Sequence, residues 1–302
     1  MGIQDKVTTT LESIQFKCLE IYEPLTLIVM KYHEPWHLGD IDKGDKIGRG
    51  TFGKVFQIKR HTCGKKYVLK TSIKMVNARK EVSLMTLLKN QSNIIPLCSY
   101  EYTEKKFDMI LPLRVVLTKV NLDRNKMGYY FNQMLMGIKQ IHDHDLIHMD
   151  IKLENIVYDE ETDTIQLIDF GVSTEFQSFK INTDVLYVNS FYYRPPEGLI
   201  TDVYPYTQNV DLWAIGCVMY YMMTGQMVVT HLTNQEALND IYELLGTTII
   251  KIPDQYIKYK NDIVINNYPG QDLTKILYPH TNLILRCLTI DPFKRPSVYD
   301  LI

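Results

Sequence analysis

Two segments give the strongest indication of what this chain is. They are His148–Asn155, with the sequence HMDIKLEN, and Asp169–Gly171, with the sequence DFG. Asp150 and Asp169 supply carboxylates, and Asn155 supplies an amide oxygen. Oxygen ligands of these kinds suit Mg²⁺ that is bound together with phosphates. A carboxylate and two metal ligands in this order also fit the transfer of a phosphoryl group to a hydroxyl. We therefore expect Asp150 to act as a catalytic base and Asn155 and Asp169 to bind the metal.

Two neighbours of the presumed base have different expected roles. Lys152 lies two residues after Asp150, where its ammonium group would steady the transferring phosphate. His148 is interpreted as a packed structural residue, because phosphoryl transfer needs no second base.

The composition is that of an ordinary globular protein that is long enough for two lobes. Of the 302 residues, 45% are hydrophobic and 23% are charged. The 33 basic and 35 acidic side chains nearly cancel, so nothing indicates direct binding of nucleic acid. The longest apolar stretches, residues 25–30 and 212–223, are too short to cross a bilayer, which argues against a membrane protein. The second of them predicts a wholly buried helix.

The five cysteines indicate a reducing compartment. They are Cys18, Cys63, Cys98, Cys217 and Cys287, and no two of them form a CxxC pair. Such spacing favours reduced, mostly buried thiols over disulfides or a zinc site. The sequence therefore predicts an intracellular protein of the cytoplasm, the nucleus or both.

A glycine-rich segment, Ile47–Val55 with the sequence IGRGTFGKV, lies upstream of the catalytic run. Its glycines Gly48, Gly50 and Gly53 would let backbone amides approach phosphates closely. A dinucleotide-binding loop would need a helix directly after the third glycine. Residues 54–58 are strand-like instead, which favours a β-hairpin that covers ATP. A glycine-rich turn that binds nothing is the alternative.

A strand lysine and a helix glutamate complete the set of candidate residues. Lys70 ends the short strand Tyr67–Lys70, and Glu81 lies in a predicted helix over residues 78–88. A lysine in this place can pair with the α- and β-phosphates and with a helix carboxylate. Taken singly, each of the two could also be a solvated surface group.

From about Asp40 onward the chain resembles the eukaryotic protein kinase superfamily. Besides the motifs above, Pro195–Glu197 is similar to the Ala-Pro-Glu of the family, and Asp211–Gly216 matches its Asp-x-Trp-x-x-Gly helix. A late arginine motif matches at Arg295, and the resemblance implies that Arg295 pairs with Glu197.

The resemblance implies a bilobal α+β fold. A small, β-rich N-lobe with one main helix would cover about residues 39–114, and a larger, mainly helical C-lobe about residues 115–302. Residues 1–38 would be an N-terminal extension packed on the kinase domain of residues 39–302. The chain ends at Ile302, soon after Arg295, so the last helix of the family is expected to be short or absent.

Within the superfamily, the chain is most similar to the cyclin-dependent and mitogen-activated kinases. Tyr192–Glu197 is similar to their Trp-Tyr-Arg-Ala-Pro-Glu, and Leu244–Thr248 resembles their Leu-Gly-Thr-Pro segment. Lys152 together with Ser190 is typical of serine/threonine kinases, in which the residue at Ser190 bonds the catalytic aspartate and lysine. The compact, divergent build is in the style of kinases that include those of large DNA viruses.

The resemblance also implies an adenine site. The hinge would run through residues 111–114, with Leu111 as the gatekeeper. The residues expected to surround the nucleotide base are Ile47, Val55, Val68, Leu111, Leu113 and Val157.

Three departures from the family bear on regulation. Met149 replaces the arginine that usually grips a phosphothreonine, and Val185 stands at the phosphothreonine position itself. Together they imply a loop that adopts its active form without that switch. Tyr187 falls where mitogen-activated kinases carry a phosphotyrosine. Lys70 and Glu81 are separated by fewer residues than is usual in the family, so the linker into the helix must be short.

The resulting hypothesis is an ATP-dependent serine/threonine protein kinase that uses Mg²⁺ and acts on protein substrates. A pseudokinase-like scaffold is the first alternative, although the four residues required for the chemistry, Lys70, Asp150, Asn155 and Asp169, are all present. A small-molecule phosphotransferase is the second. The sequence names no activating subunit.

Overall fold

The computed structural model describes residues 41–50, 53–176, 190–201, 207–250 and 262–302. The chain divides into two compact units. The first holds the residues up to Arg114 together with Asp169–Gly171, and the second holds Val115–Ile168 and Val172–Ile302. The expected extension of residues 1–38 lies outside the described residues.

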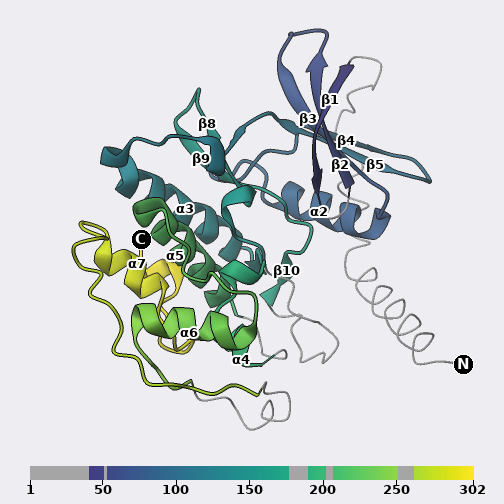
Figure 1. Ribbon diagram of the computed structural model, residues 1–302. Helices are drawn as coiled ribbons and strands as arrows, with labels where there is room; N and C mark the ends of the chain where they lie inside the picture. The colour runs from purple at the N-terminus through teal and green to yellow at the C-terminus, as the bar shows by residue number, and fades with distance from the viewer. Residues whose placement is uncertain (1–40, 51–52, 177–189, 202–206, 251–261) are drawn as a thin grey trace, which may run out of the picture. The chain divides into compact units, whose positions relative to one another are not determined.

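The first unit is built on a five-stranded antiparallel sheet (Figure 1). Its strands, in spatial order, are β1 (Ile41–Gly50), β2 (Gly53–Arg60), β3 (Lys66–Ser72), β5 (Phe107–Pro112) and β4 (Ser99–Tyr102). One helix, α2 (Met75–Leu87), packs on this sheet. Ala78 and Val82 of α2 form an apolar cluster with Tyr100, Phe107 and Met109 of the strands. The opposite face of the sheet has its own cluster around Ile58, Leu69 and Ile110.

The glycine-rich segment is a β-hairpin, as the strand-like residues after it predict. Gly50 of β1 pairs with Gly53 of β2, and no helix follows the third glycine. Only glycine fits at position 53, because a Cβ there would lie 1.8 Å from the carbonyl oxygen of Thr71. The close approach of β3 to this turn therefore fixes the third glycine of the motif.

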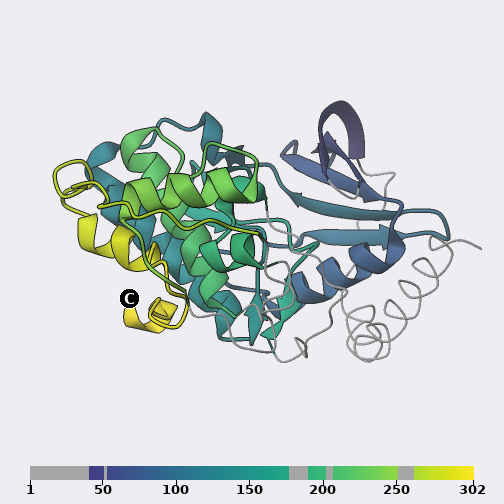
Figure 2. The same ribbon diagram turned by 60° about the horizontal axis from the view of Figure 1, so that its bottom comes forward.

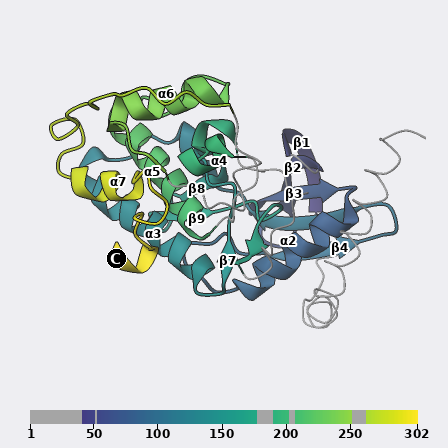
Figure 3. The ribbon, with the colours of Figure 1, turned by 90° about the horizontal axis from the view of Figure 1, so that it is seen from below.

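The second unit is mainly helical (Figures 2 and 3). Its helices are α3 (Met127–His142), α4 (Pro196–Ile200), α5 (Asn209–Thr224), α6 (Asn234–Leu245) and α7 (Thr281–Cys287). Short 3-10 turns lie at Leu117–Lys119, Arg124–Lys126, Leu153–Asn155, Phe191–Tyr193 and Val298–Asp300. Helix α5 contacts both α3 and α7, and α4 contacts α6. The result, a sheet in one unit and helices in the other, is the expected α+β bilobal fold.

Two small sheets carry the catalytic segment of the second unit. The strands β6 (Val115–Val116), β8 (Ile156–Asp159) and β9 (Thr164–Leu167) form one sheet, and β7 (Leu146–Ile147) pairs with β10 (Thr174–Glu175). The segment that contains Asp150 runs from β7 to β8, and the hairpin of β8 and β9 leads to Asp169.

Helix α5 departs from its expected burial in its last turn. Residues 210–220 are buried, including Trp213, which is fully covered. Tyr221, however, is 36% exposed, and Met222 and Met223 are half-buried. The prediction of a wholly buried helix over residues 212–223 is therefore wrong for these residues. The helix ends at Gly225, whose φ of 72° is a left-handed conformation that glycine adopts without strain.

The described cysteines are reduced, but only some of them are buried. Cys217 and Cys287 lie in the core of the second unit, whereas Cys63 is exposed. Burial raises the pKa of Cys287 to about 12, which keeps its thiol protonated and unreactive. Within the described ranges, no helix combines the length and the apolar character needed to span a membrane.

Candidate active site

The presumed base, Asp150, is held by three side chains of the second unit. Lys152 Nζ donates to Asp150 Oδ2 at 2.7 Å, and Asn155 Nδ2 donates to the same oxygen at 2.9 Å. Ser190 Oγ donates to Asp150 Oδ1 at 3.0 Å and also accepts a hydrogen bond from Lys152 Nζ at 2.9 Å. The contacts expected of Ser190 are thus present. These hydrogen bonds fix the orientation of the carboxylate, which suits a general base because such a base must lie within hydrogen-bond reach of the proton that it accepts.

A second, deeply buried carboxylate holds the backbone just before Asp150. Asp211, at the start of α5, accepts hydrogen bonds from the amides of His148 and Met149 at 2.8 and 3.0 Å. It also bonds His142 Nε2 at 3.0 Å, and its side chain is 1% exposed. Met149 has a φ of 70°, which is uncommon for a residue with a side chain. Asp211 therefore holds the strained turn that presents Asp150.

His148 is a structural residue, as expected. Its side chain is fully buried, and its Nε2 lies 3.0 Å from the carbonyl oxygen of Ile168. Its Nδ1 accepts a hydrogen bond from the amide of Asp150 at 3.3 Å. The ring thus ties the catalytic segment to the end of the β8–β9 hairpin.

In the first unit, one ammonium group joins two carboxylates. Lys70 Nζ donates to Glu81 Oε1 at 2.6 Å and to Asp169 Oδ1 at 2.8 Å. The contact between Lys70 and Glu81 forms although the two are only 11 residues apart. Burial opposes the charged form of Lys70, but the carboxylates of Glu81 and Asp169 outweigh it and raise the pKa of the ammonium group. Lys70 is therefore a permanent positive charge, suited to a phosphate.

The strand register places an apolar strip beside this charge. Val55 pairs with Lys70, and Val68 pairs with Leu111. Directly paired residues, and residues two apart on one strand, share a face of the sheet. Val55, Val68 and Leu111 therefore line the same face as Lys70. Because these three side chains are half-buried, the strip offers apolar surface to a flat ring next to a cation.

The remaining residues expected at the nucleotide lie in different surroundings. Ile47 is 49% exposed on β1, and Gly48 pairs with Val55 in the hairpin. Leu113 follows β5 and is half-buried. Val157 belongs to the second unit, where it is buried on β8 and pairs with Val116.

The donor set fits a magnesium ion that shares its ligands with phosphates. In the described part of the chain, no three His, Cys, Asp or Glu side chains form a metal-binding group. Mg²⁺ at phosphoryl-transfer sites takes only one or two carboxylates plus phosphate oxygens, so this result is compatible with it. Asn155 uses its amide nitrogen to bond Asp150. That choice leaves its oxygen, the atom that a hard cation prefers, for a metal.

One further departure from the family, Met149, can be located. Met149 is 2% exposed and packs with Ile147, Val210 and Val172 in an apolar cluster. Val185 and Tyr187 lie outside the described residues.

The late arginine pairs with its expected partner. Arg295 NH1 and NH2 donate to the two carboxylate oxygens of Glu197 at 2.8 and 2.9 Å. Both side chains are almost fully buried. The predicted pair is confirmed.

The role of Asp211 was not predicted from the sequence, in which this residue only matched a helix motif. In the structure it accepts hydrogen bonds from the backbone amides of the turn before Asp150. The sequence does contain one signal for this role, since Asp211 opens an otherwise apolar helix. A buried carboxylate needs hydrogen-bond donors, so such a residue is expected to bind backbone or side-chain donors nearby.

Comparison with known proteins agrees with this geometry. Residues 41–302 match the family model described as "Protein kinase domain". Cyclin-dependent kinase-like 2 of Rattus norvegicus is 30% identical over 288 residues, which cover 85% of this chain and 54% of the relative. MAPK/MAK/MRK overlapping kinase of Homo sapiens is 28% identical over 261 residues, or 81% of this chain and 60% of the relative. Stress-activated protein kinase jnk-1 of Caenorhabditis elegans is 29% identical over 257 residues, or 74% and 53%.

This chain spans about half the length of the curated relatives that it matches. Their names place it near the cyclin-dependent and mitogen-activated groups, as the motif at residues 192–197 had indicated. The matched region, the two units and the network around Asp150 lead to one conclusion: the chain belongs to the protein kinase family.

Proposed function

We propose that the chain is an active, ATP-dependent serine/threonine protein kinase. The observation that carries this proposal is the network in which Lys152, Asn155 and Ser190 all hold the carboxylate of Asp150. A catalytically silent scaffold would have no need to orient this group. The serine/threonine class rests on Lys152 and Ser190, together with the names of the relatives.

The protein's own groups then have separate tasks. Asp150 accepts the proton of the substrate hydroxyl, and Lys152 stabilises the negative charge that grows on the transferring phosphate. Lys70, fixed by Glu81, pairs with the phosphates of the nucleotide. Val55, Val68 and Leu111 contact its adenine. Asn155 and Asp169 would hold Mg²⁺, which when bound neutralises the charge on the phosphate oxygens.

Labelled ATP tests the proposal most directly. An Asp150→Asn variant is expected to transfer phosphate to a generic protein about 10²- to 10⁴-fold more slowly than the wild type, because it lacks the base. Asp169→Ala is expected to abolish transfer, because it removes a metal ligand. Asp143→Asn, which changes an exposed aspartate of the second unit, should leave the rate unchanged. The measurement is the initial rate of label incorporation.

The three hypotheses differ in their outcomes. Equal label in the wild type and both active-site variants would contradict kinase activity and support the scaffold. Label that appears in small alcohols but never in protein would contradict the protein substrate and support a small-molecule phosphotransferase.

Nucleotide binding has a separate readout in the thermal midpoint of unfolding. We expect ATP with Mg²⁺, at 100 times its dissociation constant, to stabilise the wild type by about 2.7 kcal/mol. Asp169→Asn should lose most of this gain, since an amide neither balances the metal's charge nor matches a carboxylate as its ligand. Asp45→Asn, at an exposed position on β1, should keep it. An undiminished gain in Asp169→Asn would contradict the assignment of Asp169.

A further inference from the structure

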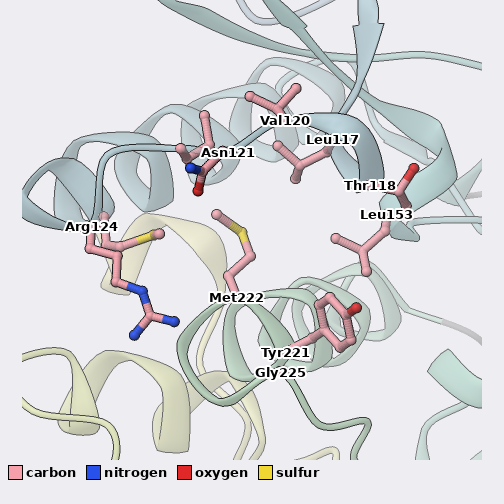
Figure 4. Close-up of a pocket in the computed structure, with 11 residues that line it drawn as sticks. Leu117, Thr118, Val120, Asn121, Arg124, Leu153, Tyr221, Met222 and Gly225 are labelled. Atoms are coloured by element: carbon pink, nitrogen blue, oxygen red, sulfur yellow. The ribbon is translucent and has the colours of Figure 1, made fainter.

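Outside the active site, the second unit contains a pocket of about 270 Å³ (Figure 4). Met222, in the last turn of α5, points into it toward Leu117, and Tyr221 lies at its side. This space accounts for the partial exposure of that turn. Apolar side chains are mixed in the lining with polar ones such as Asn121 and Arg124, so the pocket favours no single class of ligand. The first unit has a stronger feature, which is its charge.

The near balance of charge over the whole chain conceals two oppositely charged parts. Residues 41–114 contain 16 lysines and arginines but only 6 aspartates and glutamates, whereas residues 115–302 contain 14 and 23. Within the first part, the 35 residues from Lys46 to Lys80 include 11 basic side chains and no acidic one. An asymmetry of this kind is typical of proteins that bind nucleic acids or membranes.

The turn between β2 and β3 concentrates this charge. Lys59, Lys65 and Lys66 lie around it, and all three are exposed. In the part of the chain that the structure describes, none of these lysines forms an ion pair. Asp42, which faces Lys59 across β1, bonds His61 Nε2 at 2.8 Å instead. The three ammonium groups are therefore available to an anion.

The register of β2 and β3 shows that two of these lysines do not serve the sheet. Lys59 and Lys66 are directly paired, and like charges in this position destabilise an antiparallel pair. Lysines also protect edge strands from association with other chains, but β2 and β3 lie inside the sheet with a strand on each side. A bound polyanion would neutralise both ammonium groups, so binding would account for the pair.

The residues of the turn indicate the kind of anion. Lysine is a compact point charge that suits phosphate, whereas bidentate recognition of a carboxylate calls for arginine. Lysine is also depleted at protein–protein interfaces. The tip of the turn, Thr62–Gly64, has no large apolar side chain of the kind that inserts into a lipid surface. The turn therefore matches the closely spaced phosphates of a nucleic acid best.

We propose that the turn between β2 and β3 binds the phosphate backbone of nucleic acid through Lys59, Lys65 and Lys66, without reading the base sequence. This binding activity is separate from phosphoryl transfer and does not rest on it, because none of the three lysines has a part in the active site.

Fluorescence anisotropy with a short labelled DNA duplex measures this binding. We expect a Kd of about 10⁻⁶ to 10⁻⁴ M at physiological salt, which is usual for binding without sequence preference. Each neutralised phosphate adds about −0.9 to the slope of log K against log salt concentration, so three lysines predict about −2.7. The association constant K should then fall about 40-fold between about 50 and 200 mM salt. A second duplex of unrelated sequence should bind equally well.

Neutral double variants identify the lysines. Lys65→Gln together with Lys66→Gln should reduce the steepness of the salt slope by about 1.8, to about −0.9. Lys89→Gln together with Lys105→Gln removes the same charge from exposed lysines of the first unit and should leave the slope near −2.7. Lys105 is a matched control, because its turn precedes Phe107, which pairs with Ser72 at the opposite end of β3.

A charge reversal separates loss of binding from loss of folding. Lys66→Glu places an acidic side chain opposite Lys59, which is a favourable cross-strand pair. The thermal midpoint of unfolding should therefore rise or stay unchanged, while the affinity for the duplex falls about 10-fold or more.

Cys63 provides a local probe of the bound state, because its thiol is exposed within the turn. A bound duplex should slow the alkylation of Cys63 by iodoacetamide, as measured by mass spectrometry of the peptide that contains it. Protection of Cys63, together with a salt slope that falls only in the turn variants, would support the proposal.

Other outcomes would overturn it. They are a salt slope near zero, an equal loss of affinity in both double variants, and unchanged alkylation of Cys63 at saturating duplex. Tighter binding to phosphatidylserine vesicles than to the duplex would assign the turn to a membrane surface, and tighter binding to a polyglutamate peptide would assign it to an acidic protein. Either result would replace nucleic acid as the partner.

Discussion

An Arg295→Ala variant is expected to lose about 3 to 5 kcal/mol of unfolding free energy, the usual cost of breaking a buried ion pair by removing one partner. The pair between Arg295 and Glu197 is bidentate, and its side chains are 0% and 1% exposed. The guanidinium group also donates to the carbonyl oxygens of Thr289 and Asn209 at 2.9 and 3.0 Å. Without it, the carboxylate of Glu197 stays buried with no opposite charge.

Urea unfolding followed by circular dichroism measures this loss. Because domains are typically stable by only about 5 to 15 kcal/mol, the variant should unfold at a much lower urea concentration. Arg295→Lys should fall between the wild type and the alanine variant, because lysine keeps the charge but lacks the two-pronged geometry. Lys294→Ala is the control, since Lys294 is 76% exposed and should change the stability by less than about 0.5 kcal/mol. Equal midpoints for Arg295→Ala and Lys294→Ala would contradict the argument.

Replacing Asp211 by alanine is expected to reduce both stability and activity. The change removes the acceptor of two buried backbone amides, those of His148 and Met149, and of the His142 ring. Each buried donor left unsatisfied costs about 1 to 3 kcal/mol, so we expect the loss of three partners to total about 3 to 9 kcal/mol. The same amides fix the turn before Asp150, and a displacement of the base by about 1 Å can slow catalysis about 100-fold.

The Asp211→Asn variant separates the two effects. The asparagine side chain keeps one oxygen as an acceptor, so the protein should fold. One of the two backbone amides, of His148 or of Met149, then loses its acceptor, and the turn before Asp150 should shift. We expect kcat to fall while the KM for ATP changes little, since Lys70 and Asp169 are untouched. Asp272→Ala, which removes an exposed aspartate that accepts hydrogen bonds from the nearby Thr274, should affect neither quantity. Normal kcat in Asp211→Asn would show that the turn does not depend on this carboxylate.

The sequence predicted those parts of the fold that depend on local chemistry. The hairpin at Gly50 and Gly53 follows from the strand-like residues after the third glycine. A pair between Lys70 and Glu81 was expected from residue types and order, whereas the contact of Lys70 with Asp169 was not. That contact depends on how Asp169, 99 residues later, joins the first unit.

Other features could not be predicted, since they arise from packing between distant segments. A run of apolar residues such as 212–223 indicates burial on average, but it does not show that the last turn of α5 faces a pocket. The same holds for Asp211, whose donors lie more than 60 residues earlier. The fixed place of Gly53 likewise depends on the approach of Thr71 from another strand.

The packing of Met149 bears on how the activity of the protein could be controlled. Its side chain fills an apolar cluster with Ile147, Val210 and Val172, so an arginine there would bring an unpaired charge into the core. We therefore expect that an upstream kinase has no receptor here through which to turn this enzyme on.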